Sequence, residues 1–264
     1  MAYSDVLFLS MAFGDSHSKS YEKYALPTQK EYALNNNFDF ELIKERKNSK
    51  RHVTWQKIVE IKKRIFDYNF VVWLDSDVMI MNQIKNIFDY HDQSSNLTIS
   101  EDLDYRKVEN DKIRVNTGIM IWKGGQESKE MLEKIWSADN WYVNNPEKHP
   151  YEQGSLMWSI KRDENYSNKV NVDNTGQLSN YWYPASSSLK MEDVLLNNRD
   201  PSSIERILYD SPLPKKAKTK AFKETLDRNL LFERDDFLVH FAGIQQDERN
   251  RLYRRFSNHV RWHE

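Results

Sequence analysis

Short apolar segments alternate along the chain with longer segments in which apolar residues recur every three or four positions. The short segments are rich in β-branched and aromatic residues and are bounded by polar or turn-forming residues, which predicts β-strands. Six strands are expected, at Val6–Leu9, Phe38–Ile43, Phe70–Leu74, Leu97–Ser100, Gly118–Trp122 and Phe237–Phe241. Strands that alternate with helices predict an α/β fold with a mixed, mostly parallel sheet flanked by helices. In such folds, ligands bind beyond the carboxyl ends of the strands.

Two amphipathic segments predict helices between these strands. Residues Trp55–Tyr68 follow Thr54 as the expected N-cap, and one face carries Trp55, Ile58, Val59, Ile61, Ile65 and Phe66. A second helix begins near Gln126 and carries Met131, Leu132, Ile135 and Trp136 on one face. No repeat or linker divides the chain, so we expect residues 1–264 to form a single domain. Residues 214–236 are charged and weakly periodic, which predicts either a surface helix or a mobile lid.

Composition removes several classes of function. With 39 Lys and Arg against 40 Asp and Glu, the chain lacks the basic excess of a nucleic-acid-binding protein. The absence of cysteine excludes disulfides, thiolate zinc sites, iron–sulfur clusters and a cysteine nucleophile. The chain has 7 glycines and neither a GxGxxG nor a GxxxxGK[ST] motif. A bound phosphate would therefore have to be held by a metal ion or by side chains.

The N-terminal segment is expected to be a strand rather than a targeting signal. Its apolar run extends only from Val6 to Phe13, and no basic segment precedes it. No other stretch approaches the length of a membrane span. We therefore expect a soluble, cytoplasmic protein, or a protein of a Golgi-type lumen if an anchor has been removed.

Two carboxylates, Asp75 and Asp77, interrupt a long apolar run at the end of the third expected strand. Acidic groups at the end of a buried strand are unfavourable unless they are paired, hydrogen-bonded or bound to a cation. Two positions apart, they can reach one ion, and hard oxygen ligands favour Mg²⁺ or Mn²⁺ over zinc. Such an ion could stabilise a diphosphate leaving group. In the alternative interpretation, Asp75 caps the following turn and Asp77 is solvated.

Several short motifs follow one another across most of the chain. They are Val6–Ala12 with Gly14-Asp15-Ser16, Tyr24–Pro27, Glu31–Ala33 with Phe38-Asp39, Thr54–Ile58, Trp73–Asp77, Asn116–Gly118, Glu152–Leu156 and His240–Gly243. In order and spacing this set resembles glycosyltransferase family 34, whose members are galactosyl-, mannosyl- and xylosyltransferases of the metal-dependent GT-A class. The resemblance implies a Rossmann-like GT-A fold. It also implies transfer of a hexose or pentose from a UDP- or GDP-linked sugar to a glycan acceptor, with retention of anomeric configuration.

The same resemblance assigns roles to individual residues. It implies that a Mn²⁺ or Mg²⁺ ion is bound by Asp77 directly, by Asp75 through water or beside the ribose, and by His240. It places the donor at Ala12, Phe13, Lys57, Asp75, Ser76, Asn116, Thr117 and Gly243. Glu152 and Gln153 would face the anomeric carbon, where Gln153 would stabilise an oxocarbenium-like state and Glu152 could act as a nucleophile.

The residues themselves leave alternatives open at several of these positions. By spacing alone, Lys57 is more simply a solvated residue of an amphipathic helix, and a lone histidine such as His240 is more often a satisfied core residue. Asn116 and Thr117 suit a turn as well as a sugar. The family usually has a lysine two residues after Gly243, where this chain has glutamine. Arg249 or Arg251 could replace that lysine, or the diphosphate could rely on the metal and Lys57.

The aromatic residues divide into two groups. Trp55, Trp73, Trp122 and Trp136 lie on apolar faces and are expected in the core. In contrast, polar and turn-rich surroundings make four residues candidates for an acceptor platform, because sugar C–H groups pack on aromatic rings; they are Trp141, Tyr181, Trp182 and Tyr183.

Two rival functions also fit parts of the sequence. Asp-x-Asp-Val after an apolar strand is also similar to the first motif of haloacid-dehalogenase-type phosphatases, in which the first aspartate, here Asp75, is the nucleophile. That motif normally ends the first strand, whereas two expected strands precede it here. The second rival is a non-catalytic carbohydrate-binding module, which would keep the aromatic residues but not the donor chemistry.

Overall fold

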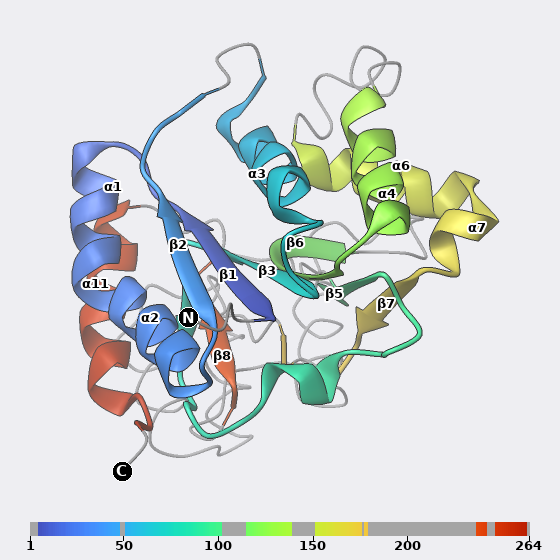
Figure 1. Cartoon of the computed structure of the whole chain (residues 1–264). Coiled ribbons are helices and arrows are strands. Elements are labelled where there is room, and N and C mark those ends of the chain that lie inside the picture. The colour runs from blue at the N-terminus through green and yellow to red at the C-terminus, as the bar shows by residue number, and fades with distance from the viewer. Residues whose placement is uncertain are drawn as a thin grey trace, which may run out of the picture.

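A computed structural model describes residues 5–47, 51–101, 115–138, 151–175, 177–178, 236–241 and 246–262. A six-stranded sheet lies at its centre (Figure 1), in the order β2 (Asp39–Ile43), β1 (Val6–Met11), β3 (Phe70–Asp75), β6 (Val115–Lys123), β5 (Leu97–Glu101) and β7 (Val170–Asp173). β1 is parallel to β2 and β3, and β5 is parallel to β7, whereas β6 is antiparallel to β3 and β5. A second, two-stranded sheet pairs β4 (Val78–Ile80) with β8 (Leu238–His240). The mixed, mostly parallel sheet predicted from the sequence is confirmed.

Helices cover both faces of the central sheet (Figure 1). One side carries α1 (Asp15–Ser20), a π-helical turn (Tyr21–Ala25), α2 (Leu26–Asn35) and α11 (Gln246–Phe256). The other side carries α3 (Gln56–Arg64), α4 (Gln126–Ser137), α6 (Glu152–Arg162) and the short α7 (Glu164–Ser167). In the described part of the chain, 3₁₀ turns lie at Val53–Trp55, Ile87–Tyr90 and Ser257–His259. Within the described ranges, no helix combines the length and apolar character needed to cross a membrane.

The apolar run of β3 is explained by burial on both faces. Val71 and Trp73 point into the core cluster shared with α3, α4 and α6, whereas Val72 and Leu74 point into the cluster shared with α2 and β8. A central strand covered on both faces has no solvent-facing positions, so its sequence is continuously apolar rather than alternating. Asp75 is therefore the first polar side chain that this strand presents, at its carboxyl end.

All six expected strands are present, with small differences at their ends, but two others were missed. β4 and β7 contain three and four residues, too few for a periodic pattern to be recognised. The last expected strand, β8, pairs with β4 rather than with the central sheet. The helix near Gln126 is confirmed as α4. Trp55, Trp73 and Trp122 are buried as predicted, and the partly buried Trp136 packs against the same core.

The expected helix Trp55–Tyr68 is shorter than predicted. It begins as a 3₁₀ turn whose N-cap is His52, not Thr54, because the His52 side chain accepts a hydrogen bond from the Thr54 N–H. It ends at Arg64, where the chain turns to enter β3. Phe66 therefore leaves the apolar face to which it was assigned, and it is 59% exposed.

Candidate active site

Lys57 connects three elements at the carboxyl end of β3. Its Nζ donates hydrogen bonds to Asp75 Oδ1 (2.9 Å), to Asp75 Oδ2 (3.2 Å) and to the Thr117 carbonyl oxygen (3.0 Å), and it lies 3.0 Å from Glu152 Oε1. The side chain is only 2% exposed, so the interpretation of Lys57 as a solvated residue is wrong. Burial by itself would lower the pKa of Lys57, but Asp75 and Glu152 outweigh burial and raise it. The ammonium group is therefore charged and holds two carboxylates together.

Asp75 is held in a defined orientation at the end of β3. Besides the two bonds from Lys57, its Oδ1 accepts a hydrogen bond of 2.6 Å from the indole Nε1 of Trp73. Gln29 supports the turn that follows, because its Nε2 donates to the carbonyl oxygens of Asp75 (3.1 Å) and Val78 (2.9 Å). Burial and the neighbouring Asp77 raise the pKa of Asp75 above its ordinary value, although Lys57 and Trp73 oppose them. A carboxylate in this situation is stabilised further by a nearby cation.

Asp77 meets the C-terminal part of the chain through the pairing of β4 with β8. Register places Val78 opposite His240, and the Phe241 N–H donates to the Asp77 carbonyl oxygen at 2.8 Å. The Asp77 carboxylate lies 3.2 Å from His240 Nε2 and 3.6 Å from Arg249 Nη1. These two groups outweigh burial and hold the pKa of Asp77 well below its ordinary value. Asp77 is therefore ionised, and the alternative in which it is simply solvated is wrong.

His240 approaches β6 at a position where only glycine fits. A Cβ added at Gly118 would lie 2.3 Å from His240 Cε1 and 2.8 Å from its Nε2, both closer than real Cβ contacts. The Gly118 N–H donates a hydrogen bond to Asn116 Oδ1 at 2.7 Å. The sequence predicted Gly118 as the start of a strand and as part of the Asn116–Gly118 motif. It did not predict Gly118 as a site residue, since nothing local reveals which side chain will approach it.

Thr117 links the start of β6 to the first turn of α6. Its Oγ1 donates to Glu152 Oε1 at 2.8 Å, and its backbone N and Oγ1 each lie 3.4 Å from Gln153 Oε1. Burial would raise the pKa of Glu152, but Lys57, Thr54 and Thr117 outweigh it and lower the pKa. Glu152 is therefore a buried carboxylate, 2% exposed, whereas Gln153 is partly exposed. Both residues lie in the first turn of α6.

The acidic pair and His240 form a group that fits a divalent cation. Each of Asp75, Asp77 and His240 offers a ligand atom, and these atoms lie within 4.8 Å of one another. Two carboxylates and one imidazole suit Mn²⁺ or Mg²⁺. Because Gly118 has no side chain, the His240 imidazole can occupy the space beside it. The donor set is therefore chemically and sterically suited to the ion that the sequence pattern predicted.

Ala12, Phe13 and Ser76 adjoin the carboxyl ends of β1 and β3. Ala12 and Phe13 directly follow β1, whose last residue Met11 is in register with Asp75, so both lie at the same end of the sheet. The Ser76 carbonyl oxygen accepts a 2.5 Å hydrogen bond from the Tyr253 hydroxyl of α11. Gly243 and the four aromatic acceptor candidates lie outside the described residues, as does all of segment 214–236 except the buried Asp236; the four are Trp141, Tyr181, Trp182 and Tyr183.

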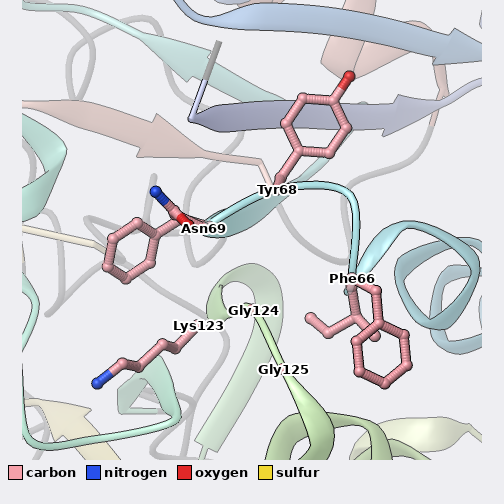
Figure 2. Close-up of a pocket in the computed structure, with 8 residues that line it drawn as sticks. Phe66, Tyr68, Asn69, Lys123, Gly124 and Gly125 are labelled. Carbon is pink, nitrogen blue, oxygen red and sulfur yellow. The ribbon is translucent and has the colours of Figure 1, made fainter. Parts of the chain in front are cut away.

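A separate hollow lies at the opposite end of β3. Its volume is about 440 Å³, and it is lined by Ile65, Phe66, Tyr68, Asn69, Phe70, Lys123, Gly124 and Gly125. Figure 2 shows the Tyr68 ring above the turn that carries both rings and the Phe66 ring below it, beside the backbone of Gly125. Phe70 is the first residue of β3 and Asp75 is the last, so this hollow is not part of the candidate active site.

Comparisons with known proteins establish the fold. No family model matches the sequence, and no curated protein matches it. The structure resembles a glycosyltransferase involved in the glycosylation of the major capsid of PBCV-1, with 17% identity over 95% of this chain and 98% of that chain and a TM-score of 0.59. More distant likenesses are to the galactosyltransferase LgtC (13% identity, 96% and 95% covered, TM-score 0.45) and mouse xyloside xylosyltransferase 1 (10% identity, 91% and 98% covered, TM-score 0.47). The first likeness confirms the predicted fold class.

Proposed function

We propose that this chain is a metal-dependent glycosyltransferase that moves a hexose or pentose from a UDP- or GDP-linked sugar to a glycan acceptor, and that residues 1–264 form one GT-A-like domain. One observation carries the proposal. On a fold shared with a glycosyltransferase, the possible metal ligands Asp75, Asp77 and His240 adjoin a buried Lys57–Glu152 pair at the carboxyl end of the sheet. This is the edge at which α/β folds bind their ligands.

The donor diphosphate would be held by charge rather than by a glycine-rich loop. A Mn²⁺ or Mg²⁺ ion bound by Asp77, His240 and Asp75 would offset the negative charge that develops on the diphosphate leaving group. Arg249 already lies 3.6 Å from the Asp77 carboxylate. Of the two arginines that could replace the family's lysine, we therefore favour Arg249, since a guanidinium can bind phosphate oxygens through two hydrogen bonds. Ala12, Phe13 and Ser76 would border the nucleoside.

The roles of Glu152 and Gln153 differ in this proposal. Glu152 is buried, and its Oε1 is shared between Lys57 and Thr117, so it positions the lysine and the start of β6. Gln153 is partly exposed beside Thr117 and would face the anomeric carbon, where its amide oxygen stabilises an oxocarbenium-like state. This arrangement suits transfer with retention, in which the acceptor hydroxyl and the leaving group share one side of the sugar. Asn116 and Thr117 would border the transferred sugar.

The phosphatase hypothesis has less support. A nucleophilic Asp75 would need an oxygen free to attack phosphorus, but both of its oxygens accept hydrogen bonds from Lys57, and one accepts a third from Trp73. The Asp-x-Asp strand is also the third strand of the chain and pairs with the antiparallel β6. We therefore propose no phosphatase activity.

Thermal unfolding in the presence of nucleotide sugars tests the proposal directly. UDP- and GDP-linked glucose, galactose, mannose and xylose are each added with Mn²⁺ and with EDTA. We expect one donor to raise the midpoint of unfolding only when Mn²⁺ is present, because a ligand that binds the native state stabilises it. We expect Asp77→Ala to lose both this shift and donor hydrolysis, with the fold retained. Near-wild-type turnover by Asp77→Ala, or no stabilisation by any donor, would refute the proposal.

A further inference from the structure

Two exposed aromatic rings adjoin the candidate active site. The rings of His52 and Tyr151 have centroids 4.6 Å apart and an angle of 66° between their planes, so together they form an open corner. Tyr151 is 44% exposed, although its ring is large and mostly apolar, and His52 is also exposed. We infer that this corner, named here the His52–Tyr151 platform, binds the acceptor sugar. The inference rests on the proposed glycosyltransferase function.

The His52 side chain and the Tyr151 backbone are held by the elements that carry them, and the two rings contact each other. His52 is the N-cap of the 3₁₀ turn before α3, and its Nδ1 lies 3.1 Å from Thr54 Oγ1. Tyr151 has extended backbone angles and directly precedes α6, and its carbonyl oxygen accepts a hydrogen bond from the Gly154 N–H at 3.2 Å. Rings that are already ordered lose little conformational entropy when a ligand packs on them.

The platform is coupled to the candidate catalytic residues by sequence and by charge. Tyr151 is followed at once by Glu152, which contacts Lys57, and then by Gln153. His52 lies close enough to Glu152 for that carboxylate to influence its pKa. A sugar packed on these rings would therefore be held next to the side chain that we place at the anomeric carbon. By contrast, Phe66 is even more exposed, at 59%, but lies at the opposite end of β3.

The chemistry of the platform suits a sugar better than a charged ligand. Partial burial and the nearby Arg46 hold the pKa of His52 below its ordinary value, although Glu152 opposes them. The imidazole is therefore neutral at neutral pH, and both rings offer apolar faces to the C–H groups of a pyranose. The platform differs from the four aromatic residues that the sequence suggested as acceptor sites, none of which is described in the structure.

Steady-state kinetics with separate donor and acceptor titrations test the inference. The acceptor probes are the methyl glycosides of glucose, galactose and mannose together with lactose and cellobiose, and the donor is the nucleotide sugar that stabilises the wild-type protein. For Tyr151→Ala we expect the acceptor KM to rise about tenfold, since a lost aromatic contact weakens binding by roughly that factor. The kcat, the donor KM and the donor-induced thermal shift of this variant should stay within about twofold of the wild-type values.

Three further variants separate a sugar-binding role from a structural one. Tyr151→Phe keeps the ring and should restore the wild-type acceptor KM. His52→Asn keeps a side chain suited to the N-cap but removes the ring, so it should raise the acceptor KM. Phe66→Ala removes an exposed aromatic ring far from the site and should change nothing.

Each contrary result has a distinct meaning. If no donor stabilises the wild-type protein, the proposed function fails and the inference fails with it. If the donor is bound and transferred but Tyr151→Ala keeps the wild-type acceptor KM, or changes the donor KM as well, the platform is refuted while the proposed function stands. The platform is equally refuted if the wild-type protein hydrolyses the donor but uses none of the five sugars better than water.

Discussion

Replacing Lys57 by methionine tests whether this lysine holds the candidate active site together. The substitution keeps a long apolar side chain but removes the charge that lies 2.9 Å from Asp75 and 3.0 Å from Glu152. Removing one partner of a buried ion pair destabilises a protein by about 3 to 5 kcal/mol, because the other charge is left buried without compensation. The Asp75 side chain is 30% exposed and can be solvated, whereas Glu152 is 2% exposed and cannot. We therefore expect a loss near the lower value, about 3 kcal/mol.

The loss should depend on pH in a defined direction. In the wild-type protein the pKa of Glu152 is lowered, so its ion pair stabilises the native state above the pKa of the unfolded chain, and this contribution disappears in acid. In Lys57→Met, burial without the lysine raises the pKa of Glu152. The variant should then recover stability as the pH falls and Glu152 takes up a proton. The difference in free energy of unfolding between the two proteins should be larger at pH 8 than at pH 5.

Urea unfolding followed by circular dichroism at both pH values measures this difference. In a thermal scan, about 3 kcal/mol corresponds to a midpoint about 6 to 12 °C lower for a chain of this size class. Lys62→Met is the matched control, since Lys62 lies on the same helix but forms a 3.6 Å pair at the surface, where about 0 to 1 kcal/mol is expected. Lys57→Met/Glu152→Gln should regain most of the stability. A loss below about 1 kcal/mol that does not change with pH would refute the reasoning.

Two more predictions concern the metal and the diphosphate. Gly118→Ala places a Cβ 2.3 Å from His240 Cε1, so His240 must shift. We expect the variant to lose about 1 to 3 kcal/mol of stability. Its Mn²⁺ binding, measured by isothermal titration calorimetry, should be at least about tenfold weaker. Unchanged Mn²⁺ affinity would exclude His240 from the site. Arg249→Gln should weaken binding of UDP or GDP with Mn²⁺ about tenfold in the same assay, because a charge-assisted hydrogen bond is lost. Arg251→Gln is the control, since two positions along a helix point to different sides, and equal losses in both variants would contradict a specific role for Arg249.

The architecture was largely predictable because it depends on local pattern. A short, continuous apolar run rich in β-branched and aromatic residues, such as Phe70–Leu74, favours a buried strand, and the helix near Gln126 repeats its apolar residues with helical period. The Asp75–Asp77 pair was visible for the same reason, since two carboxylates at the end of a buried strand need a partner wherever the strand lies. The short β4 and β7 escaped detection because three or four residues contain too little pattern to distinguish a strand from a loop.

Long-range contacts were decided by packing, which no local pattern encodes. Lys57 occupies a helical position that spacing alone assigns to solvent, yet it is buried because β3 and α6 bring carboxylates to it from 18 and 95 residues away. The resemblance to a family pointed to Lys57 and His240, but it did not show that Lys57 links Asp75 to Glu152.

The glycine at position 118 and the His52–Tyr151 platform also depend on long-range packing rather than on local pattern. An apolar residue needs burial and a carboxylate at a buried position needs a partner, wherever they lie in the fold. The strands, the main helices and the acidic pair could therefore be identified from the amino-acid sequence. A glycine that admits a histidine from another strand, or two rings that meet from the N-caps of different helical segments, depends on which surfaces approach each other. That approach is set by the simultaneous burial of all apolar faces in one packed core, so it exists only in the folded chain.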